Sequence, residues 1–144
     1  MRKKTKLNGK TINQYTLRFS SKHIAKVITE FGIVAKKSLI AKVIGLEEDR
    51  HFWRGVFDGD GWIGNRNGKD GDKMILVGSH DLLHQFKDFI QRRIPESIVT
   101  IKREGNYYRL FTYSNTARLL AKLLYDDCTI ALDRKLSKAQ KMMI

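Results

Sequence analysis

The sequence is nearly free of cysteine, because Cys128 is the only one in 144 residues. One cysteine forms no internal disulfide and cannot build a thiolate zinc site by itself. We therefore expect the fold to be stabilised by the packing of apolar side chains. The composition supplies them, with 42% hydrophobic residues that include two Trp, five Tyr and seven Phe.

Long apolar runs are also absent. No stretch approaches the roughly 20 consecutive apolar residues that a helix needs to span a bilayer. The basic start at residues 1–10 is not followed by the apolar stretch of a signal peptide. These absences predict an intracellular protein, cytoplasmic or organellar, that has no membrane partner.

Acidic residues are scarce relative to basic ones. Asp and Glu number 15 against 28 Lys and Arg, which gives a formal net charge of +13 and a pI near 10.0. An excess of this size indicates a polyanionic partner, and nucleic acid is the first candidate. Charge alone does not distinguish a DNA-binding enzyme from another basic protein, such as a ribosomal one.

Helices and strands alternate along the chain in a definite order. Apolar spacing, capping residues and turn signals predict strands and helices. The expected elements are a strand at 15–19, helices at 21–32 and 47–58, strands at 62–66 and 73–78, a helix from Ser79 to Pro95, strands at 97–103 and 107–113, and helices from Ser114 and over 130–144. This order predicts an α+β fold, in which an antiparallel sheet is covered by helices on one face.

The other face of that sheet is expected to remain open and to lie along DNA. Alternation along the strands places polar and basic residues outside the core. The residues expected to contact DNA are Arg66, Lys73, Thr100, Lys102 and Arg109, together with Arg18 in the first strand. Aromatic residues occur at both odd and even positions of residues 107–113, so the sequence does not decide which side chains of this strand face the core.

The chain contains a weak internal repeat. Residues 15–21 (YTLRFSS) are similar to residues 108–114 (YRLFTYS), and each segment leads into a predicted helix. Basic pairs follow both helices, at Lys36-Lys37 and Arg134-Lys135. We interpret residues 1–45 as a basic leader that corresponds to the end of a preceding repeat, and residues 46–144 as the main domain.

The most informative segment is 51–63 (HFWRGVFDGDGWI). On a helix, its packing face combines large and small residues, namely Phe52, Gly55, Val56 and Gly59. Small residues one turn apart allow a second helix to approach closely. Asp60 follows this face, so paired helices bring two carboxylates together, and these repel each other unless a divalent cation lies between them.

This segment resembles the LAGLIDADG motif, in which a helix with a small-residue packing face ends in an acidic residue between glycines. The elements that follow, up to 132–135 (LDRK), extend the resemblance from about residue 46 to the end. It implies that Asp60 binds metal beside the Gly59 carbonyl and that Lys135 is an active-site lysine. It also implies that Ser79 organises water, and that Lys37 is the matching lysine of the first repeat.

The resemblance implies a homing endonuclease, intron-encoded or free-standing, that cuts both strands of DNA with Mg²⁺ or Mn²⁺. Only one motif is present, so a second LAGLIDADG repeat must come from a homodimer or a separate chain. Two alternatives remain open. One is a maturase of the same fold that acts on intron RNA. The other is a non-catalytic helix-turn-helix regulator, with 36–43 as its recognition helix.

Overall fold

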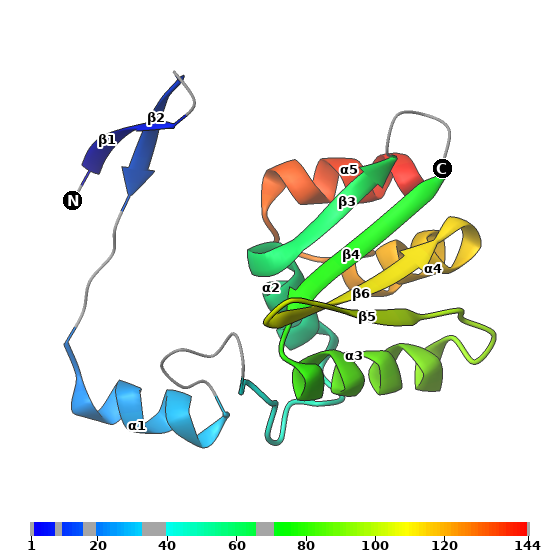
Figure 1. Ribbon diagram of the computed structural model, residues 1–144, viewed down its shortest axis with the longest axis horizontal. Helices are drawn as coiled ribbons and strands as arrows, with labels where there is room; N and C mark the ends of the chain where they lie inside the picture. Colours follow the sequence, from blue (N-terminus) through cyan, green and yellow to red (C-terminus); the bar gives the residue numbers. More distant parts are fainter. Residues whose placement is uncertain (1, 8–9, 16–19, 33–39, 66–70, 144) are drawn as a thin grey trace.

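The computed structural model of the protein describes residues 2–7, 10–15, 20–32, 40–65 and 71–143 (Figure 1). Helices and strands alternate in it much as the sequence predicts. In chain order they are β1 (Arg2–Leu7), β2 (Lys10–Tyr15), α1 (Lys22–Glu30), α2 (Arg50–Asp60), β3 (Gly61–Asn65), β4 (Asp72–Gly78), α3 (His80–Arg93), β5 (Thr100–Glu104), β6 (Tyr107–Tyr113), α4 (Ser114–Tyr125) and α5 (Asp133–Met143).

A four-stranded sheet forms the centre of the domain. Its strand order is β3-β4-β6-β5, and every neighbouring pair is antiparallel. Met74 and Leu76 in β4 lie opposite Thr112 and Leu110 in β6, and all four are fully buried on one face. Helices α2, α4 and α5 lie behind this face (Figure 1). The α+β fold with helices on one face of an antiparallel sheet is confirmed.

An aromatic cluster joins α2 and α3. Trp53 and Phe57 of α2 are fully buried, and the Trp53 ring lies 4.8 Å from the Phe86 ring and 5.9 Å from the Phe89 ring. Such tilted pairs add to the stabilisation that burial itself provides.

Among the helices that the structure describes, none is long and apolar enough to cross a membrane.

Helix α2 extends two residues beyond its predicted end near residue 58. Its N-cap is Asp49, whose carboxylate accepts hydrogen bonds from the backbone N–H groups of His51 (2.6 Å) and Phe52 (2.9 Å). At the other end, the Gly61 N–H donates to the Phe57 carbonyl and closes the last turn. A Cβ at Gly61 would lie 2.5 Å from that carbonyl oxygen, so the helix can end in this way only at a glycine.

The leader contains two strands and a helix. The sequence predicts one strand at 15–19, of which only Tyr15 is described, whereas β1 and β2 form a hairpin that pairs Leu7 with Lys10. Lysines and polar residues dominate both strands, so they lack the apolar alternation by which a strand is predicted. Helix α1 begins at Ser21 as expected, and the Ser21 hydroxyl accepts from the Ile24 N–H at 3.3 Å.

Residues 40–49 form a connecting segment with turns and bends, here called the strap, that runs along α3. The Val43 N–H donates to the side-chain oxygen of Gln85 at 2.7 Å, and the Gln85 amide donates back to the Val43 carbonyl at 2.9 Å. At the start of α3, the Ser79 hydroxyl donates to the Ala41 carbonyl. The predicted recognition helix is described only over residues 40–43, and these are not helical.

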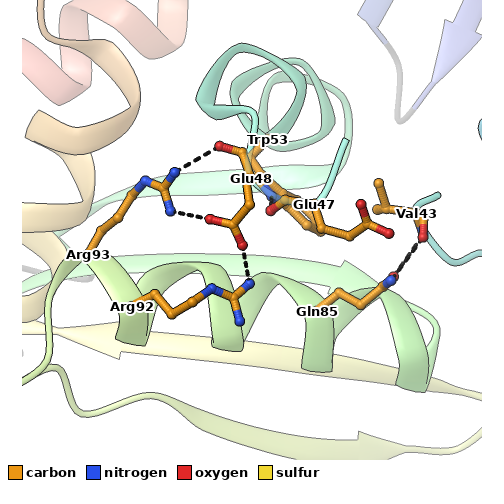
Figure 2. A network of polar contacts seen from close by, with 7 residues as sticks. All are labelled: Val43, Glu47, Glu48, Trp53, Gln85, Arg92 and Arg93. Atoms are coloured by element: carbon orange, nitrogen blue, oxygen red, sulfur yellow. Dashed lines mark hydrogen bonds and ion pairs between the residues drawn. The ribbon is translucent and has the colours of Figure 1, made fainter. Parts of the chain in front are cut away.

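Ion pairs fix the far end of the strap (Figure 2). The Glu48 carboxylate accepts from Arg93 at 2.6 Å and also pairs with Arg92, and Arg93 donates to the Glu48 carbonyl at 2.9 Å. The hydrogen bond from Arg93 is the largest cause that holds the pKa of the Glu48 carboxyl below its usual value, and the pairing with Arg92 lowers this pKa further. The Trp53 indole donates to the Glu47 carbonyl at 2.8 Å, so the strap is joined to α2 as well.

Candidate metal site and nucleic-acid interface

Asp60 is the last residue of α2 and is exposed. The C-terminal end of a helix carries partial negative charge from carbonyl groups that have no partner within the helix. The Asp60 carboxylate adds a full negative charge at the same place, and the preceding Gly59 is also exposed. This end of α2 therefore presents oxygen atoms and negative charge, which suit a hard divalent cation.

The predicted packing face of α2 has room for a second helix. Gly55 and Gly59 are exposed, and a Cβ built at either position meets no described atom within 4 Å. Phe52 and Val56, on the same face, are only half-buried and pack at the margin of the core. The residues that were predicted to pair helices thus lie together on a surface that the described part of the chain leaves open.

A cavity of about 200 Å³ lies beside this face. Phe52, Val56 and Asp60 of α2 line it on one side. Phe31 at the end of α1 and Val43 of the strap contribute to its lining as well. The cavity thus places residues of the leader next to the α2 face that carries the candidate metal ligand.

Lys135 lies against the same end of α2, although its side chain is not at the surface. Only 2% of the residue is exposed, and its ammonium group donates to the carbonyls of Phe57 (2.5 Å) and Asp58 (2.8 Å). Burial lowers the pKa of Lys135, with a further contribution from Arg134. The structure brings Lys135 close to Asp60, as the resemblance implies, and gives it the role of capping the helix.

Asp58 holds the α4–α5 connection. Its carboxylate accepts from the Tyr125 hydroxyl at 2.7 Å and from the Leu132 N–H at 2.8 Å. Burial, followed by the hydrogen bond to Asp58, raises the pKa of Tyr125. The first aspartate of the motif therefore stabilises the fold, while the second points to the surface.

Arg54 is a buried residue that sequence reasoning missed. It is 5% exposed, and its guanidinium donates to the carbonyls of Ile130 (2.8 Å) and Leu124 (3.2 Å). An arginine on an amphipathic helix is usually expected to be exposed to solvent, so the residue type alone does not predict that Arg54 is buried. Arg54 and Asp58 are four residues apart on α2, and both bind the end of α4 and the segment that follows it.

Ser79 is the N-cap of α3 and is buried. Its oxygen accepts from the Leu82 N–H at 3.2 Å, and its proton is donated to the Ala41 carbonyl. The structure assigns the hydroxyl to the start of the helix and to the strap, and its part in organising water stays a prediction. Lys37 falls outside the described residues.

Four of the predicted DNA-contacting residues share the open face of the sheet. Arg109 in β6 lies opposite Lys102 in β5. Thr100 and Lys73 lie on this same face of the sheet, opposite to the face on which Leu110 is buried. The orientation of β6, which the sequence left open, is thereby settled. Arg66 and Arg18 lie outside the residues that the structure describes.

Aromatic rings support the basic groups on this face. The Lys73 ammonium lies 4.7 Å from the Tyr113 ring centroid and 5.3 Å from that of Phe111. Arg109 pairs with Glu104 at 3.1 Å and donates to the Tyr107 hydroxyl at 3.2 Å. Cation–π and ion-pair contacts of this kind hold long side chains in place above the sheet.

Comparison with known protein families matches residues 47–124, more than half of the chain, to the family described as the LAGLIDADG-like domain. The chain belongs to the LAGLIDADG family. This family comprises homing endonucleases and maturases, and its domains bind DNA and typically pair. The match covers α2 to α4, so Asp60 lies within the LAGLIDADG-like region, whereas Lys135 follows it. No curated protein matches the chain.

Proposed function

We propose that the protein is a site-specific DNA endonuclease that cuts both strands when two LAGLIDADG helices pair. One observation carries the proposal: Asp60 ends a helix whose packing face, at Gly55 and Gly59, is open to a second helix. Pairing would bring a second carboxylate beside Asp60. One Asp60 cannot serve two scissile phosphates, so a double-strand break requires the pair.

The residues at this end of α2 fit half of a Mg²⁺ or Mn²⁺ site. The Asp60 carboxylate and the Gly59 carbonyl would hold the ion, since both supply the oxygen ligands that hard cations prefer. In the described part of the chain, no cluster of three or more His, Cys, Asp or Glu side chains could hold a metal ion. The other ligands would therefore come from the paired repeat, water and DNA. When bound, the metal would activate water and stabilise the leaving oxygen.

The remaining residues bind and position. The open face carries Lys73, Lys102 and Arg109, which would contact phosphates along a DNA groove and fix the register of the duplex. Lys135 holds the carbonyls of the last turn of α2 and so fixes the turn that ends in Asp60. We assign Lys135 a positioning role in cleavage.

Replacing Asp60 by asparagine tests the proposal. Asp60→Asn is expected to leave folding and DNA affinity intact and to abolish cleavage in Mg²⁺, because the carboxylate serves metal and not phosphate. Asp88→Asn, which changes another exposed carboxylate on α3, is the matched control and should cut normally. Loss of DNA binding in proportion to cleavage would contradict the assignment. A wild-type chain that binds nucleic acid and never cuts would favour a maturase.

A further inference from the structure

Two histidines lie one helical turn apart at the start of α3, on the outside of the protein. The sequence contains four histidines, His23, His51, His80 and His84, and only the last two are separated by four residues. Side chains at this spacing share one face of a helix. Both residues are exposed, and the centroids of their imidazole rings are 4.3 Å apart with the ring planes inclined by 36°. Two imidazoles this close to each other can bind one ion together.

The Asp81 carboxylate determines which nitrogen of His80 is available. Nδ1 of His80 lies 2.9 Å from Oδ1 of Asp81. An ionised carboxylate only accepts hydrogen bonds, so Nδ1 carries the proton, and in the neutral ring Nε2 holds the unshared electron pair. Histidines that bind metal through one ring nitrogen commonly donate the other N–H to a carboxylate, which fixes the tautomer and raises the basicity of the ligand. His80 is therefore prepared to coordinate through Nε2.

The backbone that carries the two histidines is held by the rest of the fold. The Ser79 hydroxyl caps α3 and bonds the Ala41 carbonyl of the strap, and Leu83 is fully buried in the core. The Tyr108 ring of β6 packs edge-on against the His80 ring, with centroids 5.3 Å apart and planes at 72°. The helical spacing of the pair is thus set before an ion binds, which reduces the entropy lost on binding.

Imidazole nitrogen favours a different class of cation from the oxygen atoms near Asp60. Zn²⁺, Cu²⁺ and Ni²⁺ bind imidazole well, whereas Mg²⁺ and Ca²⁺ prefer oxygen ligands. Over the residues that the structure describes, no third His, Cys, Asp or Glu side chain joins such a pair to hold one ion. Water would therefore occupy the remaining coordination positions.

We propose that His80 and His84 bind one divalent transition-metal ion through their imidazole nitrogens, with Asp81 as the carboxylate that orients His80. The site is separate from the one proposed for Mg²⁺ at Asp60, and it does not depend on DNA cleavage. The bound ion joins two successive turns of α3. It therefore stabilises the start of the helix, where Ser79 holds the strap.

Calorimetric titration of the 144-residue protein with Zn²⁺, in the presence of excess Mg²⁺, tests the site. We expect saturable binding of one Zn²⁺ per chain, with no competition from Mg²⁺. His80→Asn and His84→Asn should each abolish this binding. Asp81→Asn should weaken it about tenfold, because His80 loses the partner that fixes its tautomer. Urea unfolding in a chelator checks that every variant remains folded, and added Zn²⁺ should raise the unfolding midpoint of the wild-type protein alone among wild type and the two histidine variants.

Two matched controls and a spectroscopic measurement locate the ion. His23→Asn removes an exposed histidine of α1, Asp60→Asn removes the candidate Mg²⁺ ligand, and both should bind Zn²⁺ as the wild-type protein does. In ¹⁵N NMR, His80 should show the Nδ1–H tautomer without metal and a changed Nε2 shift with Zn²⁺. Absence of binding, equal binding by His84→Asn, or loss of binding in Asp60→Asn overturns the proposal. None of these outcomes bears on the endonuclease proposal, which is tested by cleavage in Mg²⁺.

Discussion

The ammonium group of Lys135 lies 2.5 Å from the carbonyl oxygen of Phe57, inside the protein. Seventy-eight residues separate the two positions. The contact makes the geometry of Asp60 depend on α5, because the carbonyls that Lys135 holds belong to the turn that ends in Asp60.

Lys135→Met is expected to lower the free energy of unfolding by about 2 kcal/mol, because two carbonyl groups lose a charged donor. It should also reduce cleavage under conditions where the variant stays folded, since Asp60 is no longer held. Urea unfolding and a DNA cleavage assay measure the two effects. Lys138→Met, at an exposed position of α5, should change neither. A variant that keeps full stability and loses only cleavage would show that Lys135 acts directly on DNA or water.

Gly55→Leu should separate folding from pairing. A Cβ at Gly55 meets no described atom within 4 Å, so the unfolding free energy should be unchanged or slightly higher, because leucine favours a helix more than glycine does. Assembly on DNA, followed by sedimentation, should be lost. Gly61→Ala gives the opposite pattern, because its Cβ meets Phe57 and should cost about 1–3 kcal/mol of stability. Normal assembly of Gly55→Leu would place the pairing face elsewhere.

DNA affinity is expected to fall steeply with salt and to survive chelation of divalent metal, because lysine and arginine displace counterions from phosphates. Cleavage of a cognate duplex should return with Mg²⁺ or Mn²⁺, while Ca²⁺ should support binding with little turnover. Lys102→Ala should reduce the slope of log affinity against log salt by about 0.9. Lys122→Ala, on α4 behind the sheet, should leave the slope unchanged. Double-strand breaks made by a strictly monomeric chain would refute the paired mechanism.

Asp49 links stability to pH. The backbone N–H of Phe52 holds the pKa of this carboxyl below its ordinary value of 3.8, so the folded state favours the ionised form. The stabilisation is therefore present above about pH 4 and is lost as the pH falls through the lowered pKa. Asp49→Ala should cost about 1 kcal/mol at pH 7. Urea unfolding should show that the difference from wild type shrinks in acid, and a difference independent of pH would argue against the cap.

Periodic patterns in the sequence predicted most of the main domain. The small-residue face of α2 and the open-face positions of Thr100 and Lys102 follow from periods of 3.6 and 2, which depend on local backbone geometry. The same reasoning placed Asp60 just past the end of this helix, whereas α2 includes it as its last residue. The face and the strand positions require only neighbouring residues along one element, while their roles in helix pairing and DNA binding stay predictions.

The contacts of Lys135 and Arg54 could not be predicted in this way. Both are long basic residues on amphipathic helices, for which solvent is the expected environment. Their burial depends on carbonyl groups that lie 70 to 78 residues away in the chain, at Phe57 and Asp58 for Lys135 and at Leu124 and Ile130 for Arg54. Strand β1 was missed for another reason, because its lysine-rich sequence has no apolar period.

The contact between α5 and the end of α2 also has a genetic consequence. A frameshift or stop codon after residue 124 would leave the LAGLIDADG-like region, the sheet and Asp60 in the reading frame. It would nevertheless remove Leu132 and Lys135, and with them the partners of the Asp58 carboxylate and of the last carbonyls of α2. A gene damaged in this way would still be recognised by its motif, while its product would lack the support for the aspartate on which cleavage is proposed to depend.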